Sequence, residues 1–179
     1  MVQTPAQKKN SLLPLPSDLK DRIEKIVNKV GTDCKDYIKK LIAAVDKNDK
    51  YSDDALKLFD RVNGEGGFQL KNITSKYAGQ ADINGGNRVV YLRPKSPYGN
   101  SRLDEHSTNG YAVAVLNELM HHARKDGVYE DRSLGKAAFK LLTPAEQSKY
   151  PLPDPHNVDK NSSYFHSLFN LHCHSLTGE

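Results

Sequence analysis

The stretch NELMHH, residues 117–122, lies in the middle of the apolar run Tyr111–Ala123. Apolar residues on nearly every side of this run predict a helix that is buried all round. A buried carboxylate or imidazole without a partner costs several kcal/mol or becomes neutral. Four polar side chains inside such a helix therefore mark it as the central element of the fold and as a candidate functional site.

The spacing of these polar side chains is typical of a metal-binding helix. On an α-helix, Asn117 and His121 lie one turn apart, and Glu118 lies within one turn of both His121 and His122. This is the geometry of the His-Glu-x-x-His zinc helix, in which two imidazoles bind the metal and the glutamate activates its water. Asn117 occupies the place of the first histidine.

Two other interpretations of the same residues stay open. The polar groups can form a hydrogen-bonded cluster that only ties the helix to its neighbours. Glu118 and His121 can also form a Glu-x-x-His pair of a carboxylate metal site, but such bundles need a second pair on a facing helix. The sequence contains no second Glu-x-x-His.

Composition sets the broad class of the protein. The chain has 179 residues, 37% hydrophobic and 27% charged, which is typical of one globular domain. Its net charge of +4 comes from lysines that are mixed with acids, so we expect no nucleic-acid partner. No apolar run reaches the roughly 18 residues of a membrane span.

The N-terminal segment, residues 1–16, is predicted to be a flexible tail, and residues 17–179 a single domain. Its leucines are interrupted by Pro14 and Pro16, which excludes the apolar core of a signal peptide. The prediction is therefore a cytoplasmic protein, or an exported one whose leader has been removed. Cys34 and Cys173 can form a disulfide across the domain, or can be two small buried apolar side chains.

The hydrophobic pattern predicts helices, then a small sheet, then helices again. This order indicates an α+β domain that is mainly helical, with a small antiparallel sheet. The expected helices cover about 17–31, 33–45, 52–64, 108–125, 131–142 and 162 onward, and the expected strands cover 68–73 and 88–93.

Residues 109–138 resemble the active-site region of the zincin metallopeptidases. Leu116–Ala123 is similar to the family pattern apolar-His-Glu-Leu-x-His-x-Ala/Gly, and Gly127–Asp131 resembles the aspzincin (deuterolysin-like) branch. In that branch an aspartate ten positions after the second histidine is the third ligand. The resemblance implies that His121 is the second zinc ligand, Asp131 the third and Glu118 the general base.

Asn117 stands at the first-ligand position of this pattern, and an amide oxygen is a poor zinc ligand. Three outcomes are open. Asn117 binds the metal weakly, another imidazole such as His122 or His106 replaces it, or the site is metal-free. His122 points about 100° away from His121, so both bind one ion only if the helix distorts.

The resemblance implies a zinc-dependent peptidase that hydrolyses peptide bonds, with zinc as its cofactor. Glu118 would take a proton from the water, and the strand 88–93 would pair with an extended substrate. The alternative is a catalytically inactive protein of the same fold that binds a protein partner.

Overall fold

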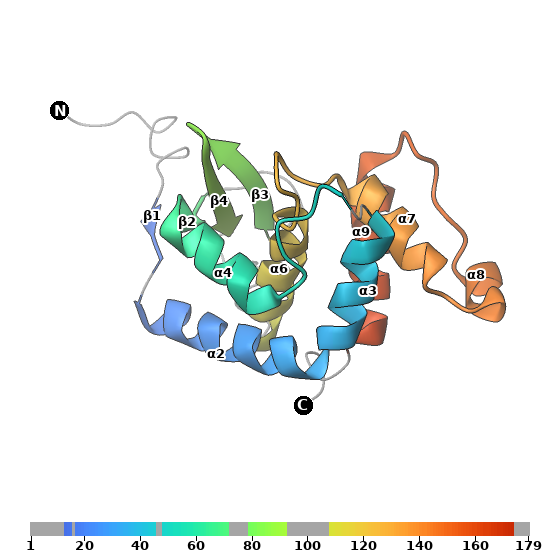
Figure 1. The fold of residues 1–179 in the computed structure, drawn as a ribbon, viewed down its shortest axis with the longest axis horizontal. Coiled ribbons are helices and arrows are strands. Elements are labelled where there is room, and N and C mark those ends of the chain that lie inside the picture. The colour runs from blue at the N-terminus through green and yellow to red at the C-terminus, as the bar shows by residue number, and fades with distance from the viewer. Residues whose placement is uncertain (1–12, 16, 46–47, 72–78, 93–107, 174–179) are drawn as a thin grey trace, which may run out of the picture.

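Helix α6 (Thr108–His121) is the centre of the fold in the computed structural model, which describes residues 13–15, 17–45, 48–71, 79–92 and 108–173. The sheet and α4 lie on one side of α6, α7 and α9 lie on the other, and α2 crosses beneath (Figure 1). Every described side chain of α6 from residue 114 on is buried. The α+β class and the central buried helix are therefore confirmed.

Three N-terminal helices follow the predicted apolar faces. They are α2 (Ser17–Asp33), α3 (Lys35–Val45) and α4 (Ala55–Gly64). Helix α2 continues past the expected stop at Gly31 and ends at Asp33. Helix α4 is capped by Asp54, whose carboxylate accepts two backbone N–H groups, rather than by the expected Ser52.

The sheet is mixed rather than purely antiparallel. Its order is β1 (Leu13–Pro14), β2 (Gly67–Leu70), β4 (Asn87–Leu92) and β3 (Gly79–Asn84). Strands β3 and β4 form an antiparallel hairpin, whereas β2 runs parallel to β4. Because β4 is paired on both sides, the expectation that residues 88–93 pair with a substrate is corrected.

Part of the predicted N-terminal tail belongs to the fold. Leu13–Pro14 forms β1 and pairs with β2, and the other residues of that segment lie outside the described ones except for Leu15. No helix of the described residues combines the length and the apolar character that a bilayer crossing requires.

Helix α6 ends at His121, four residues before the expected end. The chain after it is drawn into a short antiparallel contact with the segment before α4, in which Tyr51 N donates to Ala123 O at 2.7 Å and Lys125 N to Asp49 O at 2.9 Å. These backbone hydrogen bonds replace further helical ones.

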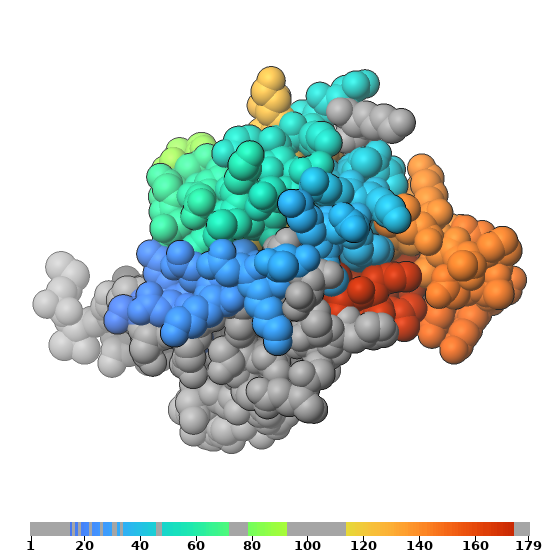
Figure 2. Space-filling model, turned by 60° about the horizontal axis from the view of Figure 1, so that its bottom comes forward, coloured from blue at the N-terminus to red at the C-terminus, as the bar shows by residue number. Residues whose placement is uncertain are grey.

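The C-terminal helices are α7 (Asp131–Lys140), α8 (Pro144–Lys149) and α9 (Val158–His172). Asn157 caps α9, which begins four residues before the expected Ser162. In Figure 2, α9 (red) lies between α3 (light blue) and α7–α8 (orange). Cys34 and Cys173 form a disulfide that ties the start of α3 to the end of α9, with Cα atoms 5.6 Å apart.

Replacing both cysteines by alanine should lower the free energy of unfolding by about 2–5 kcal/mol, since the bridge closes a loop of 139 residues and restricts the unfolded chain. Urea unfolding of the wild type and of C34A/C173A measures this difference. Reductant should destabilise the wild type only. A difference below about 1 kcal/mol would show that the disulfide contributes little.

Candidate functional site

His121 is held at the end of α6 by the segment that follows the helix. Its Nδ1 is hydrogen-bonded to the carbonyl oxygen of Tyr129, and the Tyr129 N–H donates to the His121 carbonyl at 2.9 Å. The ring of Phe165 contacts the imidazole edge-on, with centroids 6.2 Å apart. The orientation of the ring therefore leaves Nε2 for a further partner.

That partner is Asp131, the first residue of α7. His121 Nε2 lies 3.1 Å from Asp131 Oδ1, so the predicted convergence of these side chains is confirmed. Burial lowers the pKa of His121, but the hydrogen bond to Asp131 and the charges of Glu118 and Asp131 outweigh it and raise this pKa to about 9. In the metal-free protein the two side chains therefore form an ion pair at neutral pH.

Glu118 lies next to this pair and beneath the sheet, with only 6% of its surface exposed. The pKa of Glu118 is raised to about 7: burial raises it most and Asp131 also raises it, which together outweigh the lowering by the charge of His121 and the Ala81 N–H. Gly79 leaves room for this carboxyl, since a Cβ there would lie 3.0 Å from Glu118 Cγ. A buried carboxyl with a pKa near neutrality can exchange a proton at working pH.

Asn117 is buried one turn before His121, with 1% of its surface exposed. Its Nδ2 has no hydrogen-bond partner in the described part of the structure. Buried side-chain amides are normally paired, so this orphaned group is an exception that calls for an explanation.

His122, directly after α6, points toward strand β4 of the sheet. Its Nε2 is hydrogen-bonded to Val89 O at 2.9 Å, so this nitrogen is the donor, and Nδ1 accepts from Arg88 Nη1 at 3.2 Å. Burial lowers the pKa of His122 to about 4, so the ring is neutral. Because both nitrogens are engaged there, the expectation of His122 as a metal ligand is corrected.

Arg88 is a structural residue that the sequence pattern does not reveal, because arginine at the start of a predicted strand carries no sign of burial. Only 3% of its surface is exposed. Its guanidinium donates to Gly127 O and Lys125 O, both at 2.7 Å, in addition to His122. Arg88 thereby fixes the turn that leads to Tyr129 and Asp131.

His166 of α9 is a second residue without an assigned role in the sequence pattern. Burial lowers its pKa to about 4, while the charge of Asp131 raises it and that of His121 lowers it.

His106 lies outside the described residues. Among the residues that are described, no group of three or more His, Cys, Asp and Glu side chains is placed to hold a metal ion.

The donor set that is present fits zinc in part. An imidazole and a carboxylate are usual zinc ligands, and two donors on one tetrahedral zinc lie about 3.3 Å apart, close to the His121–Asp131 distance of 3.1 Å. In a zinc-binding histidine the nitrogen that does not bind the metal is usually hydrogen-bonded to a carbonyl or carboxylate oxygen. In His121 that partner is the Tyr129 carbonyl. The third protein ligand would be Asn117 through its Oδ1, because the unpaired Nδ2 is a hydrogen-bond donor and does not bind a metal.

Replacing Asp131 by Asn should lower the pKa of His121 from about 9, because burial then acts without the opposing carboxylate. NMR titration of the metal-free protein measures this pKa. Because the pKa of His121 is higher in the folded protein than its ordinary value of 6.5, protonation of His121 stabilises the fold. This stabilisation is fully present below pH 6.5 and is lost as the pH rises to about 9. The wild type should thus lose more stability than D131N over that interval, and equal losses would contradict the ion pair.

Replacing Arg88 by Met should lower the free energy of unfolding by about 2–4 kcal/mol, since it leaves the Gly127 carbonyl and His122 Nδ1 without a donor and removes one of the two donors to Lys125 O. Arg61→Met is the matched control, because the half-buried Arg61 donates to the same turn through longer hydrogen bonds, at Arg124 O (3.3 Å) and Lys125 O (3.1 Å). Its cost should stay below about 1 kcal/mol. Equal costs in urea unfolding would remove the special role of Arg88.

No protein-family model matches this chain, and comparison with curated proteins and with solved structures found no significant similarity. The resemblance of residues 109–138 to the zincins therefore stays a prediction.

Proposed function

We propose that this chain is a zincin-like protein that hydrolyses peptide bonds with zinc as its cofactor. The observation that carries the proposal is the His121–Asp131 pair, whose donor atoms lie 3.1 Å apart at the end of a buried helix. The proposed site consists of this pair together with Glu118 and Asn117.

His121 and Asp131 would hold the zinc, with the amide of Asn117 at the third position. Bound there, zinc would act as a Lewis acid on the scissile carbonyl and would make a water more acidic. The hydrogen bond from His121 to the Tyr129 carbonyl keeps Nε2 turned toward Asp131, so the two donors are oriented in advance.

Glu118 is the proposed general base. It takes a proton from the attacking water and returns it to the leaving amine, and a pKa of about 7 suits both transfers at neutral pH. Strand β3 is the edge strand next to Glu118, to which its Ala81 N–H is hydrogen-bonded. An extended substrate would pair with β3 and so bring its backbone to the carboxylate.

The second candidate function is a catalytically inactive protein that binds a protein partner through the same region. Two observations favour it. Asn117 replaces an expected ligand, and the described residues contain no group of three His, Cys, Asp and Glu donors placed for a metal. In both versions the disulfide is typical of an oxidising compartment, which supports export.

Zinc content and peptide hydrolysis by the wild type, E118Q and N117H separate the two functions. Protein purified without chelator should hold about one zinc per chain, and E118Q should keep the zinc but lose hydrolysis, because it removes the base and preserves shape. N117H should bind zinc at least about tenfold more tightly, since it places a second imidazole one turn before His121. Asn28→His on the exposed face of α2 is the control for an added histidine.

The results for the wild type and N117H distinguish the two candidate functions. Zinc binding and hydrolysis by N117H but not by the wild type would favour the inactive version. If neither protein binds zinc and N117H has a lowered melting temperature, Asn117 is a packed structural residue and the zincin proposal is wrong.

A further inference from the structure

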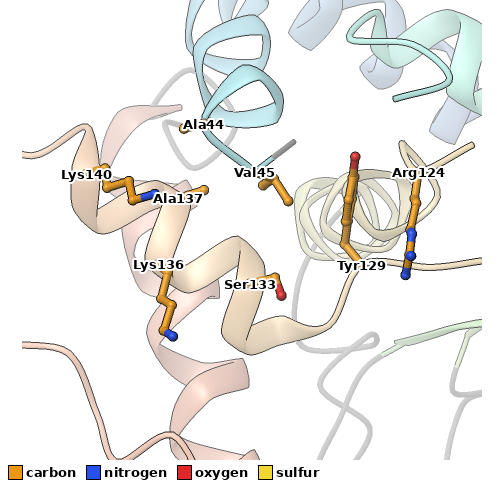
Figure 3. A pocket seen from close by; sticks show the side chains of 8 residues that line it. All are labelled: Ala44, Val45, Arg124, Tyr129, Ser133, Lys136, Ala137 and Lys140. Carbon is orange, nitrogen blue, oxygen red and sulfur yellow. The ribbon is translucent and has the colours of Figure 1, made fainter. Parts of the chain in front are cut away.

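A groove of about 330 Å³ lies between the C-terminal end of α3 and one face of α7 (Figure 3). This volume is within the range of known ligand sites, about 300–1,000 Å³. Its lining combines small apolar, hydroxyl and basic side chains: Ala44, Val45, Arg124, Tyr129, Ser133, Lys136, Ala137 and Lys140.

The groove is positively charged. Lys136 and Lys140 extend from α7 one turn apart, and neither has an ion-pair partner within the described residues. Arg124 adds a third cation, whose charge is offset by Asp49 at 2.8 Å. Among the described residues that line the groove, none is acidic. A concave surface with charges of one sign raises the local concentration of the opposite charge.

We propose that this groove binds an acidic segment of an extended peptide, with its carboxylates on Lys136 and Lys140. Side chains one helical turn apart are separated by about 5–6 Å at Cβ. In an extended chain, residues i and i+2 point to the same side and are about 6.6 Å apart, so acidic residues at these positions match the two lysines.

The rest of the lining favours a peptide over a compact anion. Val45 lies at the C-terminal end of α3, where the helix carries a partial negative charge that disfavours phosphate. A peptide, in contrast to phosphate, can donate hydrogen bonds from its backbone N–H groups to the carbonyl oxygens at that end of the helix. Ala44 and Ala137 offer small apolar contacts to the stem of an acidic side chain.

The groove adjoins the proposed site through Tyr129, whose side chain lines the groove and whose carbonyl orients His121. The segment bound in the groove would thus belong to the same peptide or protein that the site engages. The inference goes beyond the proposed function, because binding of the acidic segment does not require hydrolysis.

The test is an ¹⁵N NMR titration of the full chain, as the wild type and as the non-hydrolysing E118Q variant, with two capped peptides, Ser-Glu-Ser-Glu-Ser and Ser-Gln-Ser-Gln-Ser. The acidic peptide should shift the backbone amides of Ser133 and Ala137 and bind at least about tenfold more tightly than the Gln peptide, with an affinity that falls as salt increases. K136Q/K140Q should weaken its binding by about fivefold.

K25Q/K29Q is the matched control, because these two exposed lysines have the same i, i+4 spacing on α2. It should change the affinity by less than about twofold. Equal binding of both peptides, equal loss in both double variants, or amide shifts outside the groove would overturn the proposal. Displacement of the peptide by an equal concentration of inorganic phosphate would also overturn it, by assigning the groove to a free anion. If the wild type neither hydrolyses peptides nor holds zinc but still binds the acidic peptide, only the proposed function is contradicted.

Discussion

The burial of polar side chains in α6 constrains every element that packs against the helix. Buried polar groups are normally hydrogen-bonded, and three of the neighbouring segments supply partners. Strand β3 gives the Ala81 N–H to Glu118, β4 gives Val89 O and Arg88 to His122, and the segment before α7 gives Tyr129 O to His121. The register of the sheet on α6 is therefore set by hydrogen bonds as well as by apolar packing.

Arg88 connects the two sides of this arrangement. A guanidinium in the interior is costly unless its donors are satisfied, and here it bonds two carbonyls of the turn after α6 as well as His122. The same residue thus fixes the neutral state of His122 and the position of the turn. Since that turn leads directly to Tyr129 and Asp131, the placement of the His121–Asp131 pair depends on a residue of the sheet.

The sequence predicts those parts of the fold whose cause is local. The helical faces of α3 and α4 follow from apolar spacing, and the convergence of Asp131 on His121 follows from ten residues with a glycine turn between them. The parallel pairing of β2 with β4, the early end of α6 and the burial of Arg88 depend on partners distant in the chain. The spacing of apolar residues along the chain does not indicate which distant segments pair, so these features were missed or predicted wrongly.

Asn117 distinguishes a functional cluster from a purely structural one. Along α6, His121 and His122 have partners for both ring nitrogens, and Glu118 has an N–H donor, as a structural cluster requires. The amide of Asn117 alone among these four leaves a buried Nδ2 unpaired in the described structure. Such a group costs about 1–3 kcal/mol, which a purely structural helix would avoid with an apolar residue. The unpaired Nδ2 is a hydrogen-bond donor and cannot itself bind a cation, so a metal at this position would be bound by the Oδ1 of the same amide, while Nδ2 would still need an acceptor.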